Sequence, residues 1–148
     1  MVKYSILIPS SNGGKYLYYA VKSVLNNKYD NCEVIVSLNN TTDKSDLKSR
    51  KLKDKRLKII KTPKYFSMVK HYEWLIKKAK GDWVSIIGDD DGVVNNFFKK
   101  IDYILKKYES HDLQAISSSR AYYYWEGIEH IYGKTVVRYL DTEKMKIK

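Results

Sequence analysis

Short apolar runs alternate along the chain with longer stretches in which apolar residues recur every three or four positions. Aliphatic runs closed by polar residues are typical of buried strands, and they cover residues 4–8, 34–38, 57–60, 83–87 and 113–117. Helical spacing is clearest over residues 17–25, 68–79 and 97–108. Residues 44–58 are strongly basic and only weakly periodic, which indicates a surface helix and loop.

This alternation predicts an α/β fold, Rossmann-like, with a mostly parallel central sheet and helices on both faces. Ligands of such sheets bind outside the carboxyl ends of the strands. Polar loops follow three of the predicted strands, at residues 10–14, 39–43 and 89–91, and we expect them to meet at one edge. We assign residues 1–120 to the α/β domain. We expect residues 121–148, with an aromatic run and a segment typical of a hairpin, to be the start of an acceptor-side region or a C-terminal extension of the same domain.

Composition and charge narrow the class of protein. The 148 residues are 43% hydrophobic and 30% charged, as in a folded globular domain. A net charge of +11 favours an anionic partner such as a nucleoside diphosphate, nucleic acid or a membrane surface. The lysines are spread along the chain, however, which is equally typical of a solvated surface. With one cysteine, no signal-peptide pattern and no apolar run of about 18 residues, we expect a cytoplasmic protein or one peripheral on the inner membrane face.

Three adjacent carboxylates after the fourth predicted strand are the most informative feature. Asp89, Asp90 and Asp91 lie between two glycines. Their mutual repulsion is relieved by water or by a cation, and hard oxygen ligands suit Mg²⁺ or Mn²⁺ bound together with substrate phosphates. An isolated run of aspartates is more often a solvated turn. Its position between an aliphatic strand and an amphipathic helix favours a metal site instead.

Four motifs in order resemble the family 2 inverting glycosyltransferases, which have the GT-A fold. Residues 5–9 with Asn12 resemble the family's opening strand, and residues 34–43 resemble its second strand and following loop. Residues 79–84 resemble the segment that enters the metal strand, and residues 88–91 resemble the metal motif itself. Each motif alone is weak, but four in the family's order and spacing are fairly specific.

The resemblance implies transfer of a sugar with inversion from a nucleotide-sugar donor, a UDP-sugar being favoured, to a saccharide or lipid-linked acceptor, assisted by Mn²⁺ or Mg²⁺, as in cell-wall or polysaccharide biosynthesis. By position it assigns metal binding to Asp90 and Asp91. Asn39 replaces an aspartate that usually contacts the base, so the base stays open. The residues assigned to the nucleotide are Pro9, Ser10, Ser11, Asn12, Asn39, Lys70, His71, Asp89 and Asp90.

The same resemblance leaves the catalytic base unassigned. In the family the base follows the metal motif at a distance, in an acceptor-binding half. Glu126 and Glu129 are the only late glutamates before the terminal tail, and neither is a strong candidate. We therefore expect a donor-binding part that stops before the base.

Two other functions stay open on the sequence alone. The charge and the interleaved tyrosines favour a non-catalytic nucleotide- or nucleic-acid-binding module, although residues 89–91 would repel the phosphates of a nucleic acid unless a metal is bound. A metal-dependent nucleotidyltransferase shares the fold type and has a glycine-rich basic loop after its first strand. Residues 10–15 lack that loop's usual arginine and its longer glycine run.

Overall fold

The structure is a computed structural model of the chain and describes residues 3–44 and 46–117. The chain divides into two compact units, residues 1–106 and 107–148. The predicted boundary at residue 120 stays a prediction, because it lies outside the described residues together with the aromatic run, the hairpin segment, Glu126 and Glu129.

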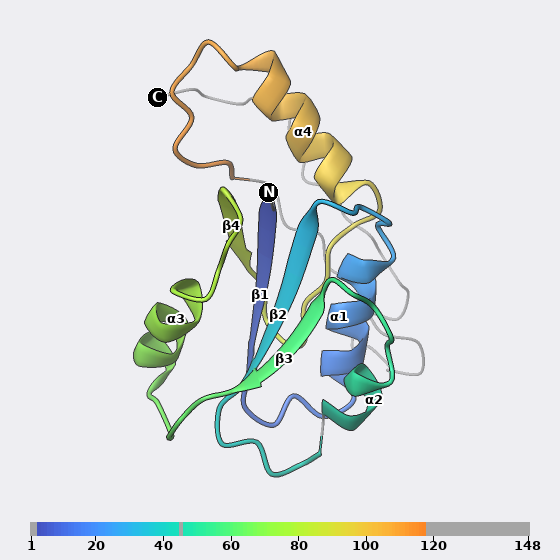
Figure 1. Cartoon of the computed structure of the whole chain (residues 1–148), viewed down its shortest axis with the longest axis vertical. Coiled ribbons are helices and arrows are strands. Elements are labelled where there is room, and N and C mark those ends of the chain that lie inside the picture. The colour runs from blue at the N-terminus through green and yellow to red at the C-terminus, as the bar shows by residue number, and fades with distance from the viewer. Residues whose placement is uncertain (1–2, 45, 118–148) are drawn as a thin grey trace, which may run out of the picture. The chain divides into compact units, whose positions relative to one another are not determined.

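Parallel strands make up the central sheet of the first unit, in the order β3-β2-β1-β4 (Figure 1). The strands are β1 (Tyr4–Ser10), β2 (Cys32–Leu38), β3 (Leu57–Lys61) and β4 (Trp83–Ile86). All three neighbouring pairs are parallel. Both β1 and β2 are buried along their whole length, as strands covered on both faces must be. The predicted α/β fold with a parallel sheet is confirmed.

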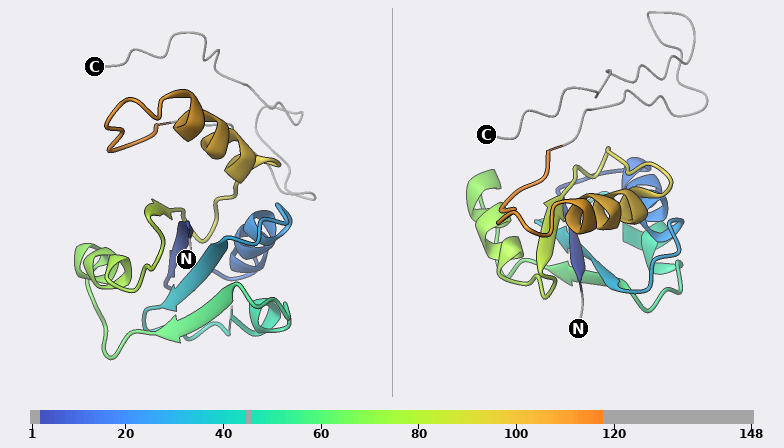
Figure 2. Two further views of the ribbon diagram at one scale, coloured as in Figure 1. Left: turned by 45° about the horizontal axis from the view of Figure 1, so that its top comes forward. Right: turned by 90° about the horizontal axis from the view of Figure 1, so that it is seen from above.

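Helices cover both faces of this sheet. They are α1 (Tyr16–Leu25), α2 (Asp46–Arg50), α3 (Met68–Ile76) and α4 (Phe97–Lys107). In two views, α1 and α3 lie on opposite sides of the strands (Figure 2). The short α2 occupies part of the basic segment for which the sequence predicts a surface helix and loop. No helix of the described residues is long and apolar enough to cross a membrane.

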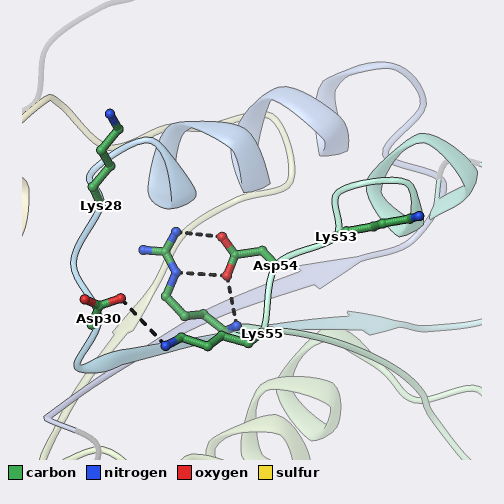
Figure 3. A pocket seen from close by; sticks show the side chains of 6 residues that line it. Lys28, Asp30, Lys53, Asp54 and Lys55 are labelled. Atoms are coloured by element: carbon green, nitrogen blue, oxygen red, sulfur yellow. Dashed lines mark hydrogen bonds and ion pairs between the residues drawn. The ribbon is translucent and has the colours of Figure 1, made fainter.

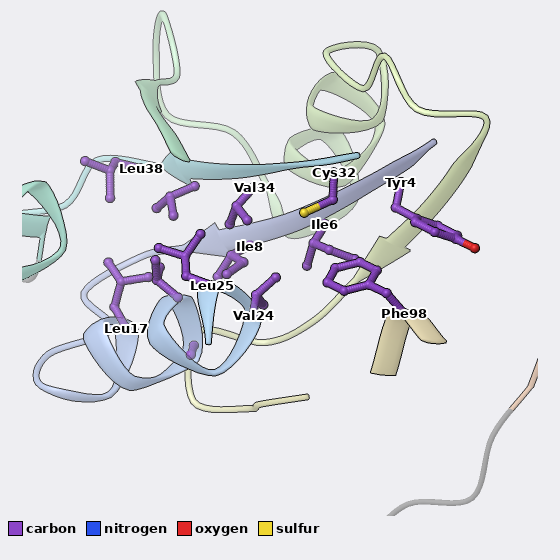
Figure 4. Close-up of a cluster of buried hydrophobic side chains, with 13 residues drawn as sticks. Tyr4, Ile6, Ile8, Leu17, Val24, Leu25, Cys32, Val34, Leu38 and Phe98 are labelled. Carbon is purple, nitrogen blue, oxygen red and sulfur yellow. The ribbon is translucent and has the colours of Figure 1, made fainter. Parts of the chain in front are cut away.

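The larger core cluster lies between the sheet and α1 (Figure 4). Alternate residues of a strand point to opposite faces. Ile6 and Ile8 therefore belong to this cluster, whereas Leu7 joins a second one with Ile35 and Leu75 of α3. Each fully buried aliphatic side chain stabilises the fold by roughly 1.5–3 kcal/mol. The two-sided core fixes the strand register and, with it, the loops at the strand ends.

Buried and partly buried carboxylates hold the amino ends of the strands. Glu33 of β2 accepts hydrogen bonds from the Ser5 hydroxyl at 2.7 Å, the Lys80 backbone N–H at 2.7 Å and the Lys58 ammonium at 2.8 Å. These contacts join three strands to the turn before β4. Gly81 of that turn packs so closely on β1 that a β-carbon there would lie 2.6 Å from the Ser5 nitrogen.

A second carboxylate, Asp102, fastens α4 to the same end of the sheet. It accepts hydrogen bonds from the hydroxyls of Tyr4 at 2.6 Å and Tyr29 at 2.8 Å, and it pairs with the Lys3 ammonium. The Tyr29 ring also stacks on Phe98 with centroids 4.8 Å apart. Burial and the hydrogen bond to Asp102 raise the pKa of Tyr29 to about 12, so both phenols stay protonated donors.

One predicted strand does not form. Residues 113–117 carry no strand in the structure. The Gln114 side chain turns back to Asp112, with a hydrogen bond of 2.7 Å. A strand needs a neighbouring strand to satisfy its backbone groups, and local alternation of apolar residues cannot supply that neighbour.

Candidate nucleotide and metal site

The three polar loops meet at the carboxyl edge of the sheet, as the sequence predicts. The Asn39 backbone N–H donates to the Ser10 carbonyl at 2.9 Å. The Ser10 hydroxyl donates to Asp89 Oδ2 at 2.5 Å. The Gly14 N–H donates to Asp43 Oδ2 at 2.8 Å. Segments far apart in sequence thus form one rim, which follows from the parallel direction of β1, β2 and β4.

Asn12 joins the first loop to the second. Its side-chain oxygen accepts hydrogen bonds from the Thr42 N–H at 2.7 Å and the Asp43 N–H at 3.3 Å. Its backbone is left-handed, with φ 62°, a conformation that asparagine tolerates better than most residues. Asn12 therefore fixes the relative position of the two loops, and its own side chain is exposed at the rim.

Asn39 is held by a third segment, residues 62–66. Its side chain is 4% exposed. Its oxygen accepts from the Phe66 N–H at 3.0 Å and from the Thr62 hydroxyl at 3.2 Å, while its amide nitrogen donates to the Phe66 carbonyl at 2.8 Å. An amide oxygen has two lone pairs, so both are used within the protein. The predicted contact between Asn39 and a base stays a prediction, and it would have to use the remaining N–H.

The structure separates Lys70 from His71, which are neighbours on α3. Lys70 is exposed. His71 is 4% exposed, and its Nε2 lies 2.7 Å from the Ser37 hydroxyl of β2. Burial lowers the pKa of His71, which favours the neutral imidazole. This helix face turns toward the sheet, so His71 belongs to the interior beneath the rim and we leave it out of the proposed nucleotide contacts.

The aspartates of the acidic triplet differ in environment. Asp89 is partly buried beside Ser10, whereas Asp90 and Asp91 are exposed. Burial raises the pKa of Asp89, the hydrogen bond from Ser10 opposes that rise, and the charge of Asp90 adds to it. Asp91 Oδ2 also accepts a hydrogen bond from the Gly88 N–H at 3.1 Å. Among the described residues, none of the three makes an ion pair.

The carboxylate oxygens at this rim suit a metal ion that is coordinated jointly by the protein and by a substrate. A β-carbon at Gly88 would lie 2.8 Å from both Asp90 Oδ1 and Asp91 Oδ2, so the two carboxylates fold over the same glycine. Within the described part of the chain, no group of three or more His, Cys, Asp or Glu side chains is arranged to hold a metal ion. Mg²⁺ and Mn²⁺ commonly bind through one or two carboxylates together with substrate phosphates. The residues fit such a shared ion.

A basic pocket at the opposite end of the sheet is a structural junction (Figure 3). The guanidinium of Arg56 makes two hydrogen bonds to Asp54, of 2.9 and 2.7 Å. It also donates to the backbone carbonyls of Leu25 and Tyr29. The remaining lining residues are Lys28, Asp30, Lys53 and Lys55. Because Arg56 is already satisfied by the protein, this pocket is a weaker candidate for an anionic ligand than the rim.

Comparison with known proteins identifies related sequences. The family model described as Glycosyl transferase family 2 matches residues 5–146. An uncharacterized glycosyltransferase of Haemophilus influenzae is 33% identical over 98 residues, which are 65% of this chain and 39% of that protein. The glycosyltransferase GlyG of Streptococcus pneumoniae is 26% identical over 134 residues, covering 83% of this chain and 44% of its own. The chain thus spans less than half the length of either relative.

Solved structures with a similar fold include donor complexes. S. aureus TarS 1-349 in complex with UDP-GlcNAc matches with a TM-score of 0.65 and 20% identity over 73% of this chain and 32% of that one. The mannosyltransferase PcManGT from Pyrobaculum calidifontis, in complex with GDP-Man and Mn²⁺, matches with a TM-score of 0.54 and 17% identity over 60% of this chain and 27% of that one. At these identities the likeness concerns the fold.

Sequence reasoning missed some of the residues that build the rim. Gly13 packs directly on Asp89, with a β-carbon position 2.5 Å from Asp89 Oδ2. Phe66 holds Asn39 through backbone groups alone. The glycine pair at positions 13 and 14 is a signal that could have pointed to a close approach. No sequence signal marks Phe66, because any residue except proline supplies the same backbone N–H and C=O.

Proposed function

Because this chain belongs to glycosyl transferase family 2, we propose that its described part binds the nucleotide-sugar donor of a glycosyl transfer reaction at the carboxyl edge of the sheet. One observation carries the proposal. Three loops from separate strands meet around Asp89, and the exposed carboxylates of Asp90 and Asp91 stand beside it without a cationic partner in the described residues.

The proposed donor contacts come from the exposed part of this rim. Ser11 and Asn12 are exposed, whereas Pro9 and Ser10 lie beneath them. We place the nucleotide along this loop, with Asp89 and Asp90 toward the sugar-phosphate portion and Lys70 at the edge. UDP is the first candidate, and the relevant solved structures hold UDP-GlcNAc, UDP or GDP-Man. Asn39 offers only an N–H, which suits a base carbonyl or ring nitrogen.

Asp90 is the proposed principal metal ligand, with Asp91 as the second. Asp91 already accepts the Gly88 N–H, so it is less free to turn toward a ligand. When bound, Mn²⁺ or Mg²⁺ supplies neutralisation of the charge that develops on a leaving diphosphate. A fold of net charge +11 can tolerate three clustered carboxylates at low cost, because the surrounding field is positive.

The later steps are proposed on the family resemblance. An acceptor hydroxyl, saccharide or lipid-linked, displaces the nucleoside diphosphate with inversion, and a carboxylate takes its proton within hydrogen-bond reach. We assign no base within the described residues. Donor binding is therefore the part of the reaction that the geometry supports, and binding is what the first experiment measures.

A thermal-shift screen of UDP, GDP, CDP and dTDP, each with and without Mn²⁺, tests the proposal. At least one nucleotide should stabilise the protein, since a ligand at 100 times its Kd contributes about 2.7 kcal/mol to the free energy of unfolding. Mn²⁺ should increase the rise in melting temperature. Asp90→Ala should remove the Mn²⁺ increment. Asp30→Ala is the matched control, because Asp30 is an exposed aspartate outside the rim.

The same screen separates the alternatives. If no nucleotide produces a shift, donor binding is excluded for this chain. A nucleotide-induced rise in melting temperature that is unchanged by Mn²⁺ and by Asp90→Ala would favour a non-catalytic nucleotide-binding module. A salt-dependent gel shift with single-stranded nucleic acid, in the absence of any nucleotide effect, would favour the nucleic-acid module.

A further inference from the structure

Ser10, Gly13 and Asp89 meet in a single close contact at the rim. The Ser10 hydroxyl donates to Asp89 Oδ2 at 2.5 Å, and Ser10 itself is only 2% exposed. A β-carbon at position 13 would lie 2.5 Å from Asp89 Oδ2 and 2.8 Å from Ser10 Oγ. The Asp89 carboxylate therefore occupies a socket with a hydrogen-bond donor on one side and a bare α-carbon on the other.

The glycine at position 13 is needed for space and not for conformation. Gly14 has a left-handed backbone with φ 54°, whereas Gly13 does not. A β-carbon at Gly14 would meet nothing closer than Asp43 Oδ2 at 4.0 Å. A methyl group at position 13 would thus collide with the carboxylate without straining the backbone, so Gly13→Ala is a steric probe of the socket.

We infer that Ser10 is a positioning residue, which orients the Asp89 carboxylate for the donor, and that Gly13 is the second wall of the same socket. Ser10 is too deeply buried to be a principal contact of the nucleotide, and its hydroxyl is already used by Asp89. A hydrogen bond to an ionised acceptor is short and directional, so it selects one orientation of the carboxylate. This assignment rests on the proposed function, in which Asp89 contacts the donor.

A double-mutant cycle on nucleotide affinity tests the assignment, with UDP and Mn²⁺ as the probe, or whichever nucleoside diphosphate the wild type binds best. Ser10→Ala should weaken binding by about fivefold to tenfold in the wild-type background, which is the usual effect of one lost hydrogen bond to a charged group. In an Asp89→Ala background the same change should have no further effect. A residue that acts through another must lose its effect when that other is removed.

Gly13→Ala should reproduce this pattern by a different route. We expect a loss of nucleotide affinity of at least about tenfold in the wild type, because the methyl group displaces the carboxylate. Beside Asp89→Ala the further loss should be at most about twofold, because only the Ser10 hydroxyl, 2.8 Å away and no longer bonded to Asp89, has to rotate aside. Ser5→Ala is the matched control, since Ser5 is a fully buried, hydrogen-bonded serine at the other end of β1. It should lower the melting temperature and leave the nucleotide Kd within about twofold.

The outcomes distinguish this inference from the proposed function. Equal effects of Ser10→Ala in both backgrounds, or no effect in either, would overturn the positioning role while leaving donor binding intact. If the wild type binds no nucleotide, the proposed function fails, and the socket is then judged by unfolding alone. Gly13→Ala should lower the melting temperature more in the wild type than beside Asp89→Ala, where only the Ser10 hydroxyl has to rotate aside; an equal loss in both backgrounds would overturn the socket.

Discussion

Carboxylates lie at both ends of this sheet, and those at the two ends differ in their hydrogen-bond and ion-pair partners. At the amino end, Glu33 and Asp102 each accept hydrogen bonds from three groups, one of them a lysine ammonium. At the carboxyl end, Asp90 and Asp91 are exposed and make no ion pair with any described residue. The first set is neutralised by the fold, and for the second we propose a cation as the partner.

The pKa shifts follow the same division. Burial alone would raise the pKa of Glu33, but hydrogen bonds from Lys58, Ser5 and Lys80 outweigh it, and the pKa is lowered. The pKa of Asp102 is lowered too, because Lys3 and two tyrosines outweigh burial. At the rim, burial wins and the pKa of Asp89 is raised. The partners around Glu33 and Asp102 thus differ from those around Asp89, which has no lysine beside it among the described ion pairs.

Removing Glu33 should have the largest effect on stability. Glu33→Ala takes away a buried carboxylate, removes the acceptor of the Ser5 hydroxyl and leaves the Lys80 N–H with only its longer hydrogen bond to Ser5 Oγ, 3.2 Å. We therefore expect a loss of about 3 kcal/mol in the free energy of unfolding. Urea denaturation measures it. Glu73→Ala, an exposed glutamate on α3, should change the midpoint little. A loss for Glu33→Ala as small as that of the control would show that the amino end does not depend on this carboxylate.

Asp102→Asn should have the second-largest effect on stability. The amide keeps the shape of the carboxylate but not its charge, and it can no longer accept from Lys3, Tyr4 and Tyr29 together. A loss of about 1–2 kcal/mol is expected, again from urea denaturation, with Asp30→Asn as the exposed control. Asp102→Asn without cost would mean that packing of Phe98, and not this hydrogen-bond cluster, holds α4 in place.

Acid should weaken the amino end before the rest of the fold. The folded-state pKa values of Glu33 and Asp102 lie below their unfolded values. Their contribution to stability is therefore complete above pH about 5 and is lost as the pH falls through the folded-state pKa values. Urea midpoints measured from pH 7 down to pH 3 should decline, and Glu33→Ala should decline less steeply. Parallel declines of the two proteins would contradict the assignment.

Changing the exposed rim carboxylates Asp90 and Asp91 should have the smallest effect on the stability of the ligand-free protein. Asp90→Asn relieves repulsion from its neighbours and removes no hydrogen bond or ion pair that the structure records. The melting temperature should therefore be unchanged or up to about 2 °C higher than that of the wild type. Asp91→Asn should raise the melting temperature less, because Asp91 accepts a hydrogen bond from the Gly88 N–H. A loss of stability as large as that of Asp102→Asn would show that the carboxylates at the two ends of the sheet contribute equally to the fold.

Much of this arrangement could be predicted from the sequence, for a physical reason. Parallel strands bring their carboxyl ends to one edge, so the order of strands and polar loops is enough to place residues 10–14, 39–43 and 89–91 together. The apolar face of α1 follows from helical spacing in the same way. These features depend on local pattern and on a topological rule that holds for the whole fold class. The apolar stripe predicted for α3 is wrong, because Met68, Val69 and Ile76 are exposed and the buried residues of that helix are His71 and Leu75.

The features that could not be predicted depend on partners distant in sequence. The periodicity of α3 indicates a helix, but it cannot show that His71 meets Ser37, 34 residues away. Asn39 is held by backbone groups of Phe66, which leave no trace in the residue type. Residues 113–117 have a strand-like pattern but no strand in the structure, because pairing is decided by a neighbour and not by the segment itself.

Calorimetric titration of UDP into the 148-residue chain, with Mn²⁺ or with EDTA, tests the central claim most directly. A carboxyl edge that holds a cation against a diphosphate should give at least tenfold tighter binding with Mn²⁺, about 1.4 kcal/mol, and Asp90→Ala should bind equally in both conditions. Equal affinity of the wild type with Mn²⁺ and with EDTA, or an Mn²⁺ effect that survives Asp90→Ala, would contradict it.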